Sequence, residues 1–116
     1  MDSPLQQKSF LFALQIIKLS RHLKEIYNEF DIARQILKSG TSIGANIREA
    51  RNVQSPTDFI SKLSIALKEA DETQYWLELI HAADMMSDQN YQSAINDLKE
   101  LIAMLTSSIK TTKKKK

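Results

Sequence analysis

Apolar residues recur at alternating spacings of three and four along most of the chain, which is typical of amphipathic helices packed side by side. The first such segment begins at Ser3 and Pro4, where a serine cap, a proline at the first helical position and Gln6 at the third form a helix start. Its core positions follow at helical spacing: Phe12, Ile16, Leu19, Leu23 and Ile26. The pattern predicts a first helix with one face in the core of a bundle.

The second apolar segment predicts a helix that starts between Asn28 and Asp31, two good capping residues, and ends near Asn52. Its core positions are Ala33, Ile36, Gly40, Ile43, Ile47 and Ala50. Gly40 and Gly44 each cost a helix interior about 1 kcal/mol relative to alanine, so the stretch around Gly40 could instead be a break between two shorter helices. We favour a continuous helix because the apolar pattern keeps its phase across Gly40, where a glycine would also let a neighbouring backbone come close.

Two further helices follow. The third has a clear start, with Ser55 as cap, Pro56 next and Asp58 at the third position, where the carboxylate meets the positive end of the helix. Its core positions are Phe59, Leu63, Ala66, Ala70, Thr73, Leu77 and Ile80. The fourth begins near Ser87 or Asp88, and its core positions are Tyr91, Ala94 or Ile95, Leu98, Ile102, Leu105 and Ile109. Short connections predict an all-α fold, an up-down-up-down antiparallel four-helix bundle.

The first and third predicted helices each carry a second apolar face. On the first helix, Phe10, Leu14 and Ile17 lie opposite the core positions. The second face of the third helix combines apolar and acidic residues: Ile65, Glu69, Glu72, Trp76 and Leu79. One small bundle cannot bury two faces of the same helix, and a large exposed apolar strip usually marks an interface. We therefore expect the protein to form a homo-oligomer.

Composition favours the same architecture and narrows the chemistry. The 116 residues suffice for one domain, and only two glycines and two prolines favour an almost entirely helical chain. The lack of cysteine excludes disulfides, thiolate metal sites and cysteine nucleophiles. The apolar stretch 10–19 is interrupted by Gln15 and Lys18, and no cleavable signal precedes it. We expect a cytoplasmic protein without membrane contact, with residues 1–109 forming the bundle and 110–116 a basic, disordered tail.

The net charge of +2 hides an uneven distribution. Residues 1–51 carry eight basic and five acidic groups, whereas residues 52–109 carry three basic and nine acidic groups. All four arginines lie in the first segment, which makes it the better candidate for contact with a polyanion, and the C-terminal lysines add to it. The candidate contacts are Arg21, Lys24, Arg34, Lys38, Arg48, Arg51, Lys113 and Lys114. The alternative interpretation is solvated helix faces followed by a frayed basic terminus.

No group of residues forms a recognisable catalytic or cofactor site. A di-metal bundle needs two Glu-x-x-His pairs; Glu78 and His81 supply one, but His22 has Leu19 three residues before it. The segment Gly40–Gly44 lacks the lysine and the preceding strand of a phosphate-binding loop. We therefore expect a protein that is not an enzyme and holds neither a metal nor another cofactor.

Asn46 and the acidic residues near Trp76 are better explained as structural groups. Asn46 flanks the core stripe of the second helix, where an unpaired amide would cost about 1–3 kcal/mol. Glu69 and Glu72 lie beside Trp76, at the edge of any contact that buries the indole. We predict that Asn46, Glu49, Glu69 and Glu72 form a polar network that holds one helix register, with a ligand site as the alternative.

Residues 45–77 carry a more specific pattern, A-N-I-x-E-A followed by S-x-x-D-F-I-x-K-L-x-I-A-L-K-E-A-x-E-T-x-Y-W-L. It resembles the four-helix-bundle proteins encoded by intervening sequences of bacterial 23S rRNA genes, a family similar to the accessory variability determinant of diversity-generating retroelements. The resemblance implies a barrel-shaped homopentamer. Retroelement relatives are basic and bind nucleic acid together with a reverse transcriptase, so it also implies RNA or DNA as a partner.

One departure from these basic relatives leaves an alternative function open. Residues 1–109 carry 11 basic and 14 acidic groups, so contact with nucleic acid depends on the arginines and the lysine tail. The alternative is a structural adaptor that binds another protein and makes no contact with nucleic acid.

Overall fold

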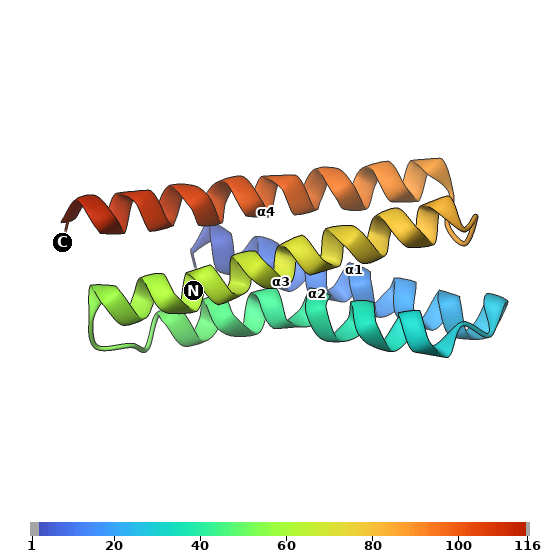
Figure 1. The fold of residues 1–116 in the computed structure, drawn as a ribbon, viewed down its shortest axis with the longest axis horizontal. Helices are drawn as coiled ribbons and strands as arrows, with labels where there is room; N and C mark the ends of the chain where they lie inside the picture. The colour runs from blue at the N-terminus through green and yellow to red at the C-terminus, as the bar shows by residue number, and fades with distance from the viewer. Residues whose placement is uncertain (1–2, 116) are drawn as a thin grey trace.

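The protein is all-α. The structure, a computed structural model, describes residues 3–115 and consists of four helices: α1 (Pro4–Tyr27), α2 (Phe30–Ala50), α3 (Pro56–Ala82) and α4 (Asp88–Lys115). Figure 1 shows the helices side by side along the long axis, with the chain turning back at each connection. The α1–α2 and α3–α4 connections lie at one end of the molecule, and the α2–α3 connection lies at the other with the end of α4. The molecule is elongated, with extents of 48 × 24 × 20 Å.

Serine caps begin three of the helices at the predicted positions. At α1, the backbone N–H of Gln6 donates to Ser3 Oγ (3.2 Å) and that of Ser3 donates to Gln6 Oε1 (3.4 Å), which completes the capping box. At α3, Ser55 Oγ accepts a backbone N–H at 3.1 Å, and before α4 Ser87 Oγ does the same at 3.1 Å. These predicted starts are confirmed, since each hydroxyl pairs an N–H that has no partner within its helix.

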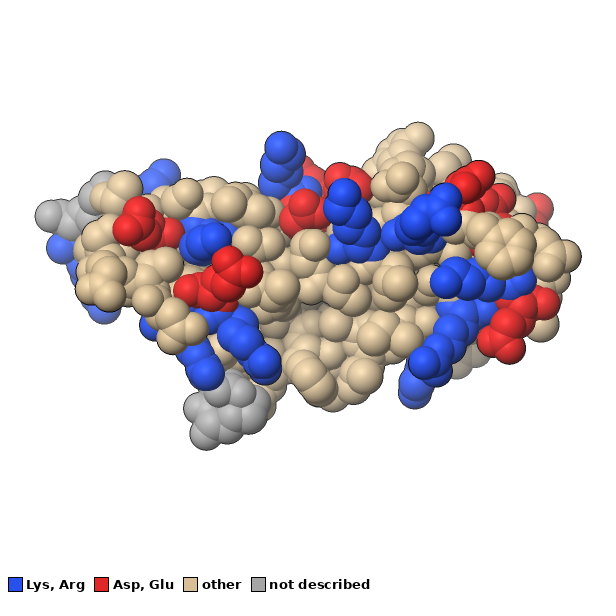
Figure 2. Space-filling model, turned by 90° about the horizontal axis from the view of Figure 1, so that it is seen from below, with Lys and Arg blue, Asp and Glu red and all other residues tan. Residues whose placement is uncertain are grey.

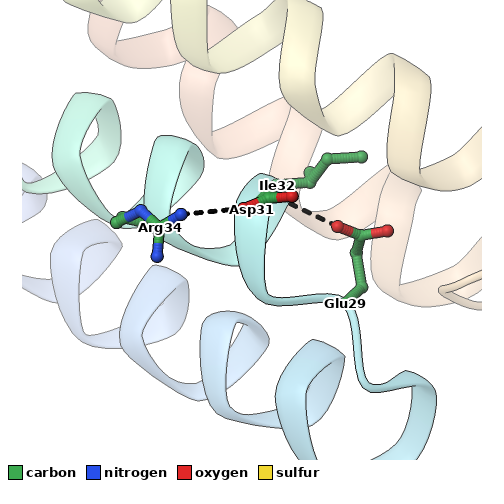
Figure 3. Close-up of polar contacts among 4 residues, drawn as sticks. All are labelled: Glu29, Asp31, Ile32 and Arg34. Carbon is green, nitrogen blue, oxygen red and sulfur yellow. Dashed lines mark hydrogen bonds and ion pairs between the residues drawn. The ribbon is translucent and has the colours of Figure 1, made fainter.

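The start of α2 lies within the predicted range, but neither predicted residue caps it. Asn28 instead closes α1 in the left-handed conformation, with φ of 52°, and its N–H donates to two carbonyl oxygens of α1. The cap of α2 is Glu29, whose carboxylate accepts the N–H of Ile32 at 3.2 Å (Figure 3). The connection between α1 and α2 is short. Asn28 ends α1 there because asparagine tolerates the left-handed conformation better than most residues do.

α2 is continuous through Gly40, as predicted, and ends at Ala50, slightly before the predicted end. A Cβ atom added at Gly40 would lie 2.8 Å from Cγ2 of Ile16 in α1. The missing side chain therefore lets the fully buried Ile16 lie against the backbone of α2. At Gly44 the nearest atom to an added Cβ is Ser9 Oγ at 3.3 Å, so the two helices are close there as well.

One apolar stripe from each helix forms the core. In α3 every predicted core position from Leu63 to Ile80 is buried, and Phe59 packs against the core at its edge. In α4, Leu101 is also buried, beside the predicted Leu98. None of the described helices has an apolar stretch long enough to cross a membrane.

One predicted core position of α1 is wrong. Ile26 is 63% exposed, and Leu23 is the last buried residue of this helix. The predicted stripe followed a repeat of 3.5 residues, whereas a straight helix has 3.6 residues per turn, so the stripe rotates away from the core over the length of the helix.

The C-terminal lysines differ from the prediction of a disordered tail from residue 110 onward. α4 continues through Lys115, and Lys116 lies outside the described residues. Lysine is a good helix former, and Lys113, Lys114 and Lys115 in the last turn face the negative end of the helix dipole. The same charges that suggest a solvated tail therefore also favour an extension of the helix.

An ion-pair cluster connects α1 to α4. Lys8 Nζ lies 2.6 Å from Glu100 Oε1 and 3.8 Å from Asp97 Oδ1. The hydrogen bond that Lys8 donates to the Glu100 carboxylate raises the pKa of Lys8 above its ordinary value. The contact between α1 and α4 is the least extensive of the four helix pairs that touch, so this cluster is a main link between them.

The two glycines of α2 allow a matched test of the close approach to α1. Gly40→Ala should lower the free energy of unfolding by about 1–2 kcal/mol, because overpacking against Ile16 outweighs the gain of about 1 kcal/mol in helix propensity. The Cβ atom of Gly44→Ala would lie 3.3 Å from the Ser9 hydroxyl and 3.5 Å from its backbone carbonyl oxygen, so this variant should be neutral or slightly stabilising. Urea unfolding at one fixed protein concentration measures both, and a Gly40→Ala variant as stable as Gly44→Ala would contradict the packing.

Candidate nucleic-acid interface

The structure separates the candidate phosphate contacts into two groups at opposite ends of the molecule. The turn group lies near the α1–α2 connection: Arg21, Lys24, Arg34 and Lys38. The tail group lies near the α2–α3 connection and the end of α4: Arg48, Arg51, Lys113 and Lys114. One bound phosphate cannot meet both groups, because the long axis of the molecule lies between them.

Acidic residues accompany the turn group. Arg34 Nη2 lies 2.8 Å from Asp31 Oδ1, and both side chains are exposed (Figure 3). Glu29 caps the same helix one turn earlier, and Glu25 follows Lys24 in α1. An exposed ion pair of this kind stabilises little, but it cancels the charge that Arg34 would offer to a phosphate. The structure thus shows Arg34 paired with Asp31.

The tail group has fewer acidic neighbours. From residue 101 onward, α4 contains four described lysines and no acidic residue. Arg51 and Lys115 line one hollow of about 320 Å³, together with the α2–α3 connection and Thr112. Arg51 Nη1 also donates to Gln6 Oε1 at 3.5 Å. Because α4 stays helical through Lys115, it places this lysine at the hollow near the C-terminal end of α2, whereas Lys110 and Lys114 line a separate hollow formed by α4.

Figure 2 shows the charge on the face that lies lowest in Figure 1. Lys and Arg side chains lie along most of this face, and Asp and Glu side chains lie among them near both ends and at the middle of the upper edge. A hollowed stretch near the middle carries no charged side chain. This face is therefore of mixed charge, and it gives no continuous basic surface.

The second faces of α1 and α3 are exposed, as the hypothesis of self-association requires. On α1, Phe10 is 56% exposed and Leu14 43% exposed, and the adjacent Leu11 is exposed as well. On α3, Ile65 and Leu79 are exposed. Trp76 is only half-buried by its own chain, packed against the core, and its Nε1–H donates to Glu72 Oε2 at 3.1 Å.

The predicted polar network is not joined within one chain. The Asn46 amide donates to the carbonyl oxygen of Ser42 in its own helix at 2.8 Å. Glu49 Oε1 instead accepts from Lys62 Nζ of α3 at 2.8 Å. Glu72 bonds only the indole of its own helix, and no contact within residues 3–115 joins these groups to each other. The helical spacing of these residues predicts a shared network, but Asn46, Glu49 and Glu72 each form a hydrogen bond to a different group.

A buried polar contact that the pattern did not predict connects α2 to α3. The Thr73 hydroxyl lies 2.9 Å from Ser39 Oγ and 2.8 Å from the carbonyl oxygen of Glu69, and both hydroxyl residues are fully buried. A second such contact connects α1 to α2, where Ser20 Oγ donates to the carbonyl oxygen of Ala33 at 3.1 Å. In the sequence, these contacts are indicated only by small hydroxyl residues at core positions. Their partners depend on how each helix is rotated about its own axis.

The possible metal ligands Glu78 and His81 have other partners. His81 Nε2 lies 2.6 Å from Asp88 Oδ1, and its ring stacks on Tyr91 with centroids 4.0 Å apart. Glu78 Oε2 accepts from Gln74 Nε2 at 3.2 Å. Within residues 3–115, no three His, Asp or Glu side chains are grouped so that they could hold a metal ion.

Comparison with known proteins places this architecture in context. The family model of the 23S rRNA-intervening sequence proteins matches residues 1–107. A similar solved structure is the crystal structure of a protein with unknown function from the S23 ribosomal protein family of Bacteroides thetaiotaomicron VPI-5482. The two sequences are 50% identical, the match covers 91% of this chain and 98% of that chain, and the TM-score is 0.90. No curated protein matches this chain.

The buried hydroxyl pair can be compared with the half-buried Asn46. Thr73→Val should lower the free energy of unfolding by about 1–2 kcal/mol, because the buried Ser39 hydroxyl loses a partner. Asn46→Ala should lower the free energy of unfolding by less than about 1 kcal/mol, because the carbonyl group of Ser42, which accepts from Asn46, lies within α2. The double variant Ser39→Ala with Thr73→Val should be no less stable than Thr73→Val alone. Denaturant unfolding of the wild type and the three variants measures these differences. An Asn46→Ala variant that costs more than Thr73→Val would instead support the polar network.

Proposed function

The chain belongs to the 23S rRNA-intervening sequence protein family, and from that premise we propose that it is a self-associating, non-enzymatic helical bundle that binds RNA or DNA. The family match over residues 1–107 confirms the resemblance inferred from residues 45–77. The observation that carries the proposal is the basic end of α4, a helical run of lysines in which Lys115 lines the same hollow as Arg51. A cytoplasmic location stays a prediction.

We propose that the antiparallel up-down-up-down bundle is the protomer of a ring-like homopentamer. The exposed apolar faces of α1 and α3 support self-association, because a lone bundle would leave Phe10, Leu11 and Leu14 in water. The ring size rests on the family resemblance. In a ring, one modest basic surface is repeated about an axis, so several weak phosphate contacts act together on one polymer.

Nucleic-acid contact is assigned first to the tail group with Lys115. Its lysines extend from a helix whose residues 101–115 include no acid, so no acidic residue of these turns offsets their charge. The turn group is assigned a lesser part, because Arg34 is engaged by Asp31.

A protein adaptor remains the second candidate function, and one observation favours it. Tyr75 is 55% exposed, and its ring meets that of Trp76 edge to face at 5.0 Å. Exposed aromatic pairs of this kind are frequent anchors in protein–protein interfaces.

The oligomer is tested by placing a charge on the exposed face of α1. The wild-type protein should have a mass of about five times 13.3 kDa by light scattering. Leu14→Glu should dissociate it with little loss of helicity, because the charge would have to be buried in the interface. Ala103→Glu adds the same charge to exposed α4 and should leave the mass unchanged. A wild-type mass of 13.3 kDa would refute self-association.

The nucleic-acid contact is tested by neutralising each group in turn. The triple variant Lys113→Gln, Lys114→Gln and Lys115→Gln should weaken binding to mixed-sequence RNA about tenfold or more at low salt and flatten the salt dependence, since each lost phosphate contact removes about 0.7–0.9 from the logarithmic slope. Arg34→Gln should change the affinity by less than about threefold, because Asp31 already neutralises it. If the wild type binds neither RNA nor DNA at low salt, the nucleic-acid function is wrong and the adaptor function replaces it.

A further inference from the structure

The seam between α1 and α4 opens into a pocket. The two helices are joined at one end of the seam by Lys8 with Glu100 and Asp97. Further along, residues 15–22 of α1, Met86 of the α3–α4 connection and residues 90–94 of α4 line a pocket of about 340 Å³. This volume lies at the lower end of the range that small-ligand sites occupy in proteins, and a site between helices of a bundle is a common position for one.

The pocket has an apolar floor and a polar rim. Ile16 and Ala94 are buried core residues, and Leu19 and Met86 pack against them. The rim is formed by polar side chains from both helices: Gln15, Lys18, His22, Asn90 and Ser93. Among residues 3–115, none that lines the pocket is acidic, and Lys18 supplies a positive charge.

The rim side chains are available to a ligand. Within residues 3–115, the side chains of Gln15, Lys18, Asn90 and Ser93 have no hydrogen-bond or ion-pair partner, and His22 only meets the ring of Tyr27. The nearest acids along α4 do have partners. Asp88 pairs with His81, and Asp97 lies in the cluster of Lys8.

We propose that this pocket binds one nucleotide of a single-stranded RNA or DNA. The base would lie on the apolar floor, where the amides of Gln15 and Asn90, from opposite walls, offer both donors and acceptors to its edge. Lys18 would meet the adjoining phosphate. A base held in a duplex cannot enter such a pocket, whereas unpaired bases are the usual targets of sequence contacts in RNA. This inference rests on the proposed nucleic-acid function and names the class of nucleic acid bound.

Single nucleotides test the pocket independently of any polymer. Uridine 5′-monophosphate should shift the methyl NMR signals of Ile16, Leu19 and Ala94, whereas inorganic phosphate should not. Lys18→Met should weaken binding of the nucleotide at least threefold, while Lys99→Met, an exposed lysine of α4 outside the pocket, should not. If millimolar uridine 5′-monophosphate leaves these signals unmoved, the pocket proposal is overturned whatever the polymer does.

A polymer experiment separates this inference from the function it rests on. The wild type should prefer a fluorescent single-stranded oligonucleotide to its duplex. Ser93→Trp, an exposed position at the rim, should weaken single-strand binding about fivefold or more, the loss of one base contact, and leave duplex binding unchanged. Equal binding of both forms, unaffected by Ser93→Trp, overturns the pocket and leaves the nucleic-acid function standing. Binding of neither form at low salt refutes both.

Discussion

The close approach of α1 to α2 is the constraint on which the rest of the structure depends. It is made possible at Gly40, where the missing side chain leaves room for Ile16. Ser9 lies against Gly44 on one side of this point, and Ser20 bonds the carbonyl oxygen of Ala33 on the other. α1 is therefore held against α2 along most of its length, by van der Waals contact and by a buried hydrogen bond.

This arrangement shapes the seam on the other side of α1. α1 contacts α4 less extensively than it contacts α2, and the ion-pair cluster around Lys8 joins α1 to α4. The remaining part of the seam is the pocket, with core residues as its floor and unpaired polar groups as its rim. Phe10 and Leu14, on another face of α1, are left exposed to solvent. The functional surfaces that we propose are thus what remains after the core has been packed.

The structure redistributes the charges that the sequence offers. Arginines and lysines that are equivalent in the sequence differ in the positive charge they can offer a phosphate, because their neighbours in the structure differ. The positive charge of Arg34 is offset by Asp31, three residues earlier in the same helix. Lys113 and Lys114 gain a fixed position because α4 does not end at residue 109. Glu49, expected in a polar network with Asn46, pairs with Lys62 across the α2–α3 contact.

The sequence by itself determined the local structure. The serine caps at Ser3 and Ser55, the continuity of α2 through Gly40 and the core stripe of α3 depend on residues within a few positions of each other, and all were predicted. Only the tertiary structure decided which polar groups meet, as with Ser39 and Thr73 or Glu49 and Lys62. Those pairs depend on the rotation and axial offset of whole helices, which side-chain packing sets and which a helical repeat does not encode. The pocket between α1 and α4 likewise depends on the tertiary structure, because residues of both helices line it.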